Sequence, residues 1–214
     1  MDNDLLWIRS FITSRDNFSE DIDLVQIKEG SIKPLFERLR ERMKFLGTKR
    51  SVKQNANNNT VVYRFESEIP PVVNLRLKIE INCREHFSVL GLKEVKFETA
   101  STWFKGNCSL ISYELEELLG TKLRALYQRR KGRDLFDLWW AANNQDIDRM
   151  KLLRCYNEYM RFVVTKPPTS KQFLQNLDEK INDHEFGHDV NGLLRPEIEY
   201  NSEKGYRYIK ALIL

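Results

Sequence analysis

The period of the hydrophobic pattern changes once along this chain, and that change limits the folds open to it. Apolar and polar residues alternate through Val61–Glu66 and again through Val72–Asn82, which is the period of half-buried strands. From about Ser112 onward, apolar residues instead recur every three or four positions, as they do in helices. Strands followed by helices predict an α+β chain. We expect a strand-containing domain over residues 1–108 and a helical bundle over residues 109–214.

The expected elements follow from this periodicity and from the residues that begin and end helices. Helices are expected at 4–14, 31–45, 112–119, 122–131, 134–143, 146–163, 170–182 and 202–214. Strands are expected at 18–25, 61–66, 72–82 and 92–98, with antiparallel neighbours, and the Asn-rich segment 47–60 is expected to be a loop. Ser31 is the expected N-cap of its helix. Gly120 and Gly132 are expected to separate helices.

Composition excludes several classes of protein. The 214 residues are 41% hydrophobic and 31% charged, which is typical of a globular chain and not of a disordered or collagen-like one. No run approaches the roughly 18 apolar residues of a membrane helix, and the acidic N-terminus lacks the basic start of a secretion signal. Cys83, Cys108 and Cys155 are odd in number and widely spaced. This pattern indicates reduced thiols and a cytoplasmic protein.

The segment Ser19–Leu24 (SEDIDL) carries an Asp-x-Asp pair on an expected strand. Residues two apart in a strand share a face, so Asp21 and Asp23 lie side by side. Their repulsion is costly unless a cation neutralises it, and Mg²⁺ prefers carboxylate oxygens together with water and phosphate ligands. The pair is therefore a scaffold for phosphoryl or nucleotidyl transfer. A solvated acidic edge or turn is the ordinary alternative for such a pair standing alone.

A third carboxylate lies on a later expected strand. Glu80 is surrounded by apolar residues in the sequence and shares its strand face with Lys78. The two side chains are either an ion pair at a sheet edge, or a third metal ligand beside a phosphate-binding amine.

The segment Lys122–Arg133 (KLRALYQRRKGR) contains six basic residues and no acid. At helical spacing Lys122 and Arg129 fall, with the final arginine, on roughly one face. This face is either solvated or a clamp for triphosphate oxygens, to which Arg and Lys donate charge-assisted hydrogen bonds. In that setting Asp134 and Asp137 are expected to orient the arginines rather than to bind metal.

Taken in order, three stretches resemble the AbiEii/AbiGii-type nucleotidyltransferases, which are toxins of bacterial abortive-infection and toxin–antitoxin systems. They are Phe18–Leu24, Lys78–Glu80 and Lys122–Leu138, with weaker similarity at Phe186–Val190. The resemblance implies a polymerase-β-like nucleotidyltransferase domain with a mixed or antiparallel sheet, followed by a C-terminal helical bundle. It also implies transfer of a nucleotide from an NTP to an acceptor, with tRNA 3′ ends as a known acceptor class, and a cognate antitoxin as partner.

The resemblance assigns roles by motif position. The implied catalytic and Mg²⁺-binding carboxylates are Asp21, Asp23 and Glu80. The implied contacts to the nucleotide and its phosphates are Ser19, Lys78, Lys122, Arg129 and Arg133, with Asp134 and Asp137 supporting them.

The chain departs from the family at one motif. The family carries Lys-Gly-Gly-Thr/Ser ahead of the first Asp, where backbone N–H groups cradle the triphosphate, whereas no glycine precedes Gly30 here. Either the coding sequence starts upstream or the cradle is lost. Two functions therefore stay open: a Mg²⁺-dependent toxin nucleotidyltransferase, and a catalytically inert relic that binds nucleic acid or a protein.

Two further patterns carry metal-ligand or basic side chains. His184 and His188 form an HExxH pattern, which in zinc proteases lies on a regular helix. Gly187 inside the pattern and its polar flanks favour surface histidines, so no zinc is expected. Residues 33–53 carry eight basic and two acidic side chains, which form either a solvated helix face or a groove for RNA phosphates.

Overall fold

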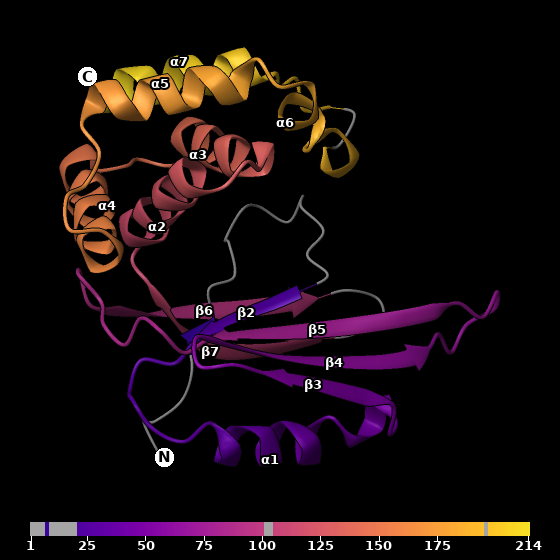
Figure 1. Cartoon of the computed structure of the whole chain (residues 1–214). Helices are drawn as coiled ribbons and strands as arrows, with labels where there is room; N and C mark the ends of the chain where they lie inside the picture. The colour runs from indigo at the N-terminus through magenta and orange to yellow at the C-terminus, as the bar shows by residue number, and fades with distance from the viewer. Residues whose placement is uncertain (1–6, 9–20, 101–104, 195–196) are drawn as a thin grey trace. The chain divides into compact units, whose positions relative to one another are not determined.

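The chain, seen here in a computed structural model that describes residues 7–8, 21–100, 105–194 and 197–214, separates into two compact units (Figure 1). Among these residues the first unit contains 7–8, 21–88 and 92–113, and the second contains 89–91 and 114 onward. The division falls after Tyr113, beyond the boundary that we expected near residue 108. The reason is that residues 105–113 form a strand that the sequence pattern did not indicate.

The first unit contains a five-stranded sheet with strand order β1-β2-β5-β4-β3. Its strands are β1 (Trp7–Ile8), β2 (Asp21–Val25), β3 (Arg50–Gln54), β4 (Asn58–Glu66) and β5 (Asn74–Asn82). β2 and β5 run parallel, and the other neighbours are antiparallel. A separate antiparallel pair is formed by β6 (Leu92–Ala100) and β7 (Lys105–Tyr113). The expected α+β class with a mixed sheet is confirmed.

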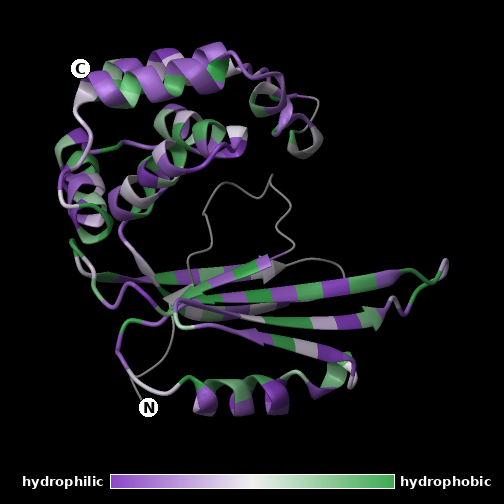
Figure 2. Cartoon of the chain, in the orientation of Figure 1, coloured by the Kyte–Doolittle hydropathy of each residue, from purple (hydrophilic) through white to green (hydrophobic). Residues whose placement is uncertain are grey.

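One face of the five-stranded sheet is apolar and is covered by α1 (Lys33–Arg42), as Figure 1 shows. The buried side chains at its centre are Val61, Tyr63, Ile79 and Ile81. Packed against them from α1 and the following 3₁₀ turn (Lys44–Leu46) are Leu35, Phe36, Leu39, Met43 and Leu46. The apolar stripe expected for this helix is therefore confirmed. In Figure 2, hydrophobic (green) and hydrophilic (purple) residues alternate along β4 and β5, so the sheet face away from α1 is largely polar.

The second unit is a bundle of helices around one apolar core. Its helices are α2 (Leu115–Gln128), α3 (Gly132–Asn144), α4 (Arg149–Val163), α5 (Ser170–Ile181), α6 (His184–His188) and α7 (Ser202–Ile213), with a 3₁₀ turn at Asn191–Leu193. Fully buried core side chains include Leu119, Leu123, Leu135, Leu152 and Phe173. The expected C-terminal helical bundle is confirmed. Nowhere in the described part of the chain is a helix long and apolar enough to cross a membrane.

Gly120 lies inside α2, where the sequence predicted a break between two helices. A Cβ atom at this position would lie 2.7 Å from Cys155 Cβ and 2.8 Å from the Tyr156 nitrogen, both on α4. The glycine thus permits a close approach of two helices instead of ending one. Gly132 similarly begins α3 instead of ending a helix, and a Cβ atom there would collide with the Phe186 carbonyl oxygen.

Three expectations for the first unit were wrong. Trp7–Ile8 form a strand that pairs with β2, and the rest of the helix expected at 4–14 lies outside the described residues. The expected loop 47–60 contains β3, whose side chains are all exposed, and a strand without a buried face shows no hydrophobic alternation. The residue that caps α1 is Ile32, while Ser31 accepts a hydrogen bond from the Lys33 N–H just ahead of the helix.

Candidate functional site

Parallel pairing of β2 and β5 brings the acidic strand beside the strand that carries the third carboxylate. Asp21 lies opposite Lys78, and Asp23 lies opposite Glu80. Paired residues on neighbouring strands project to the same face, and the apolar residues that alternate with these four pack on the α1 side. The four side chains therefore share the polar face of the sheet. We call Asp21, Asp23, Lys78 and Glu80 the sheet cluster.

Lys78 links two carboxylates of the sheet cluster. Its Nζ donates to Asp21 Oδ2 at 2.9 Å and lies 3.1 Å from Glu80 Oε2. Burial by itself lowers the pKa of Lys78, but the hydrogen bonds and charges of Asp21 and Glu80 outweigh it and raise the pKa above its ordinary value. The side chain is therefore an ammonium at neutral pH, and the cluster holds a positive charge beside its acids.

The sheet cluster supplies oxygen ligands of the kind that Mg²⁺ prefers, but not a complete set. Asp21 and Asp23 offer hard carboxylate oxygens from one strand face. Among the residues that the structure describes, no three His, Cys, Asp or Glu side chains converge as a ready metal cage. Mg²⁺ commonly keeps water and substrate phosphates as ligands. The residues thus fit an ion that arrives with a nucleotide better than a permanently bound structural ion.

The basic segment forms a second cluster, in the helical unit. Arg129 donates from Nε and Nη2 to the two carboxylate oxygens of Asp134, at 2.6 and 2.7 Å. Lys122 Nζ lies 3.2 Å from Asp134 Oδ1 and 2.8 Å from Asp137 Oδ2. We call Lys122, Arg129, Asp134 and Asp137 the helical cluster.

Asp134 is the central anion of the helical cluster. Its side chain is fully buried. Burial by itself raises the pKa of Asp134, but the hydrogen bonds from Arg129 and the charge of Lys122 outweigh it and hold the pKa below its usual range. At Asp137, burial outweighs Lys122 and raises the pKa. Asp134 is therefore the carboxylate that holds both Lys122 and Arg129 in place.

The turn that joins α2 to α3 is anchored by two acids near α6. The side chain of Arg133 is exposed, while its backbone N–H donates to Asp189 Oδ2 at 3.3 Å. Its neighbours Arg130 and Lys131 form ion pairs with Asp183 and Asp189 respectively. Sequence reasoning missed both acids as partners of the basic segment. The weak family similarity around Asp189 was the available signal.

A family model for protein sequences matches residues 11–206 and describes a nucleotidyl transferase AbiEii toxin of a type IV toxin–antitoxin system. The chain belongs to the AbiEii family. The resemblance seen in the sequence is thereby confirmed: this AbiEii chain is a member of a family described as nucleotidyl transferase toxins. Membership of a type IV toxin–antitoxin family also implies a cognate antitoxin.

Solved structures share the fold of this AbiEii chain. MenT4, a nucleotidyltransferase toxin of Mycobacterium tuberculosis, is 15% identical with a TM-score of 0.58, over 98% of this chain and 75% of its own. JHP933 of Helicobacter pylori is 17% identical with a TM-score of 0.52, over 92% of this chain and 75% of its own. At such identities the likeness supports the fold alone. The comparison with curated proteins gave no match.

The structure places the site residues expected for an AbiEii protein in two groups, one in each unit. The sheet cluster places the three implied metal ligands and Lys78 on one face of the sheet. The helical cluster joins Lys122 and Arg129 to the supporting aspartates through ion pairs. Arg133 lies exposed beside the helical cluster. Ser19 lies outside the described residues. The roles of all these side chains stay predictions.

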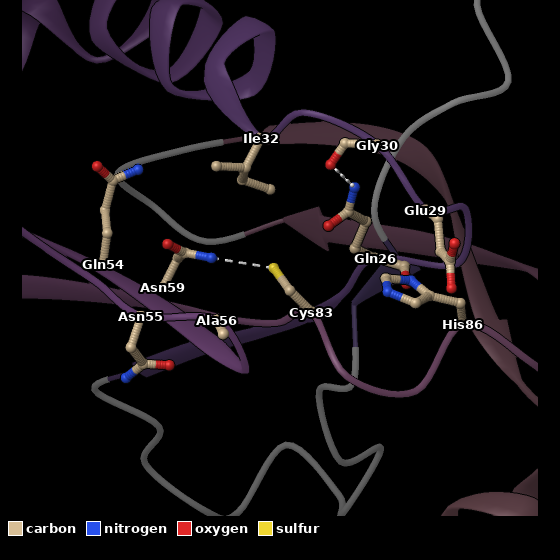
Figure 3. Close-up of a pocket in the computed structure, with 10 residues that line it drawn as sticks. All are labelled: Gln26, Glu29, Gly30, Ile32, Gln54, Asn55, Ala56, Asn59, Cys83 and His86. Carbon is tan, nitrogen blue, oxygen red and sulfur yellow. Dashed lines mark hydrogen bonds between the residues drawn. The ribbon is translucent and has the colours of Figure 1, made fainter.

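A polar pocket of about 500 Å³ lies in the first unit of the AbiEii chain (Figure 3). Gln26 Nε2 donates to the Gly30 carbonyl at 3.1 Å, and Asn59 Nδ2 donates to Cys83 Sγ at 3.1 Å. His86 Nδ1 lies 2.7 Å from the Gln26 carbonyl oxygen. Burial raises the pKa of the Cys83 thiol, which makes it a poor nucleophile. The pocket has room for a small polar molecule, although several of its polar groups already bond one another.

The two histidines of the HExxH pattern lie on α6, which has only five residues. Their rings stack with centroids 4.0 Å apart, and His188 Nδ1 lies 2.8 Å from the His184 carbonyl oxygen. A zinc protease needs both rings to point at one ion from a regular helix. The expectation that this AbiEii chain has no zinc site stays a prediction.

Proposed function

We propose that this AbiEii chain is a Mg²⁺-dependent nucleotidyltransferase that transfers a nucleotide from an NTP to an RNA acceptor, with tRNA as the favoured class, and that this transfer makes it a toxin. The observation that carries the proposal is the sheet cluster, in which a lysine and a glutamate lie directly opposite two aspartates on parallel strands. Carboxylate oxygens and an ammonium on one face are what a metal–triphosphate complex requires.

Each member of the sheet cluster has a distinct role in this proposal. Asp21 and Asp23 would hold Mg²⁺, which supplies charge neutralisation and activation of the acceptor hydroxyl when bound. Before the nucleotide binds, the positive charge of Lys78 offsets the repulsion between the neighbouring carboxylates. Its ammonium would then donate to phosphate oxygens. Attack in line at the α-phosphorus depends on positioning and charge neutralisation. Glu80 helps Asp21 to hold the Lys78 ammonium, or serves as a third ligand.

The helical cluster would bind the triphosphate. Lys122 and Arg129 supply charge-assisted donors for phosphate oxygens. Asp134 holds both of these side chains, which reduces the entropy that they lose when a phosphate binds. Arg133 is exposed on the adjoining turn and would add a third cation.

Isothermal titration of the purified chain with each NTP in the presence of Mg²⁺ tests the nucleotide site. Asp21→Asn and Asp23→Asn keep the size of the side chain and remove a metal-binding charge. Saturable binding is expected in the wild type, with affinity about tenfold or more weaker in both variants. Glu37→Gln is the matched control, because Glu37 is an exposed acid on α1. Unchanged binding in Asp21→Asn contradicts the proposal.

Transfer itself is tested with α-labelled NTP and bulk tRNA. The wild type is expected to label the RNA and to arrest growth when expressed, while Asp21→Asn does neither. Label that appears equally with Asp21→Asn would mean that the chemistry lies elsewhere in the chain.

A second function is an inert relic that binds RNA or a partner protein, and the eight basic against two acidic side chains of residues 33–53 favour it. This function predicts RNA affinity that falls with salt and is indifferent to Mg²⁺ and NTP. Absence of NTP binding in the titration, together with salt-dependent RNA binding, would favour this second function over nucleotidyl transfer.

A further inference from the structure

The polar face of the sheet carries a second basic feature, one step along the strands from the sheet cluster. Arg64 on β4 lies directly opposite Arg76 on β5. Arg76 is two residues before Lys78, and Arg64 is two residues after Val62, which is the β4 partner of Lys78. Because side chains two apart share a strand face, both arginines lie on the face of the sheet cluster. The backbone of Lys49, just before β3, lies beside Arg64, because its carbonyl accepts a hydrogen bond from the Arg64 N–H at 3.0 Å.

Two arginine side chains therefore face each other across neighbouring strands. Like charges placed directly opposite on antiparallel strands repel and destabilise the pair. Both arginine side chains are exposed. Arg64 Nη1 donates to Ser51 Oγ at 3.1 Å, and Ser51 lies opposite Val62 on the same face. The guanidinium of Arg64 is thus held along the sheet surface, beside the like charge of Arg76. Two exposed guanidinium groups side by side offer their donors to a single anionic ligand.

We propose that Arg64 and Arg76 bind the phosphate backbone of the RNA acceptor and guide its reacting end to the sheet cluster; this inference rests on the proposed function. A strand rises about 3.4 Å per residue, so the arginine pair lies roughly 7 Å from the row that contains Asp21 and Lys78. A phosphate bound there belongs to a nucleotide close to the reacting hydroxyl. Guanidinium groups suit this task because their planar donor forks match phosphate oxygens.

Strand order favours a polynucleotide over the triphosphate as the ligand of the pair. The aspartates proposed to bind metal lie on β2, whereas the arginines lie on β5 and β4, and the Lys49 backbone, just before β3, lies beside Arg64. The cations therefore extend away from the aspartates across the sheet. A ligand that reaches from β2 toward β3 is longer than a triphosphate, and an RNA strand has the phosphates to match.

Fluorescence anisotropy with end-labelled tRNA over a range of salt concentrations tests the inference. Arg64→Gln/Arg76→Gln removes two cations, so we expect affinity for tRNA to fall about tenfold or more at low salt. The slope of log affinity against log salt should become less steep by about 1.4 to 1.8, as for the loss of two phosphate contacts. In the transfer assay, the variant should raise KM for tRNA with little change in kcat.

A matched control separates this site from general attraction to a basic protein. Arg38→Gln/Arg42→Gln removes the same charge from exposed positions on α1, which covers the other face of the sheet. Its affinity and salt slope should stay close to those of the wild type. An equal loss in both double variants overturns the inference and points to the basic residues of 33–53 instead. Arg64→Lys/Arg76→Lys keeps the charge and should retain the salt slope with a smaller loss of affinity.

The titration with NTP distinguishes failure of this inference from failure of the proposed function. Arg64→Gln/Arg76→Gln should bind NTP as the wild type does, and circular dichroism should show an unchanged fold. Loss of NTP binding in this variant assigns the pair to the nucleotide site and overturns the inference. A wild type that binds NTP and transfers it, but whose tRNA affinity is unaffected by the arginine substitutions, also overturns it. A wild type that binds no NTP refutes the proposed function itself.

Discussion

At the scale of single residues, buried charged groups are held by several partners from more than one segment. Asp134 accepts hydrogen bonds from Arg129 only five positions earlier, and the local sequence pattern suffices to expect that pairing. Asp21 and Lys78 are 57 positions apart. No local pattern predicts their contact, because it depends on which strands become neighbours in the sheet. The sequence could therefore identify the members of the sheet cluster but not their arrangement.

Asp134→Asn is expected to lower the free energy of unfolding by about 3 kcal/mol, the lower end of the range for breaking a buried ion pair. The substitution leaves Arg129 and Lys122 without their central anion. Asp146→Asn, an exposed acid after α3, is the control and should change little. Urea denaturation measures both. Near-equal stabilities for the two variants would contradict the central position of Asp134.

The same comparison has a predicted dependence on pH. The folded pKa of Asp134 lies below its usual range, so its contribution to stability is present above the unfolded pKa of about 3.9. It is lost as the pH falls through the lower, folded pKa. The stability difference between the wild type and Asp134→Asn should therefore stay constant from pH 7 to pH 5 and shrink below about pH 4. Denaturation curves across this range check the trend.

Lys180 is a buried lysine that the sequence did not single out. Its Nζ donates to the carbonyls of Leu126 and Tyr127, which are acceptors that the last turn of a helix leaves unpaired. Burial, and then the charge of Arg130, lowers the pKa of Lys180 to about 8. The lysine thus fastens the end of α2 immediately before Arg129. It lies on α5, so only the tertiary fold brings it there.

Lys180→Met is expected to alter the response of stability to alkaline pH. Between about pH 8 and the ordinary lysine value of 10.5, the unfolded chain keeps the proton that the folded chain has released, so stability contributed by this group rises with pH. The wild type should gain about 1 kcal/mol relative to Lys180→Met from pH 8 to pH 9. Urea denaturation at closely spaced pH values measures the gain. Parallel curves for the two proteins would show that Lys180 is not titrating in this range.

At the scale of secondary structure, the elements that the sequence predicted are those with one buried face. The elements that show a hydrophobic period and were expected close to their observed positions are α1, β2, β4, β5, α3, α4, α5 and α7. The short helix α6 was not expected. β3 was missed because its five side chains are exposed. β7 was missed as well, because most of its side chains are also at least partly exposed. Gly120 was misread because a glycine at a helix crossing resembles a helix end in sequence.

Gly120→Ala is expected to destabilise the chain by about 1–3 kcal/mol, as overpacked cores do. The new methyl group would collide with Cys155 and the backbone of Tyr156, and this outweighs the intrinsic preference of helices for alanine. Gly187→Ala is the matched control, since the nearest atom to a Cβ there is Ser202 Oγ at 3.9 Å. It should be neutral or slightly stabilising. Thermal denaturation of the two variants checks the contrast.

At the scale of the whole molecule, the helical unit is not a single stretch of chain. It includes residues 89–91, although in the sequence these lie between β5 and β6, which belong to the first unit. The Val89 and Leu90 N–H groups each donate to the carboxylate of Glu117 at 2.8 Å. Tyr159 donates its hydroxyl to the same carboxylate at 2.7 Å. Glu117 is fully buried, so these donors replace the water that its oxygens lose.

Glu117→Gln is expected to cost about 2 kcal/mol, because an amide N–H₂ then faces groups that are themselves donors. The amides of Val89 and Leu90 should exchange with solvent at least about tenfold faster, since that factor corresponds to roughly 1.4 kcal/mol of lost protection. Glu179→Gln on the exposed side of α5 is the control. Hydrogen exchange followed by mass spectrometry measures both variants. Unchanged protection at 89–91 would show that Glu117 does not hold this segment.

The anchoring of residues 89–91 by Glu117 also decides how this protein can be recombined with its relatives. A chimera that exchanges everything after Tyr113 would take Glu117 and Tyr159 from one parent and the segment that they hold from the other. Any difference in backbone at 89–91 would then leave a buried carboxylate facing foreign amides. Successful crossovers need two additional junctions, on either side of that short segment. The helical unit must therefore be exchanged as two separate pieces of sequence, residues 89–91 and the residues after Tyr113, although the latter alone resemble a complete domain.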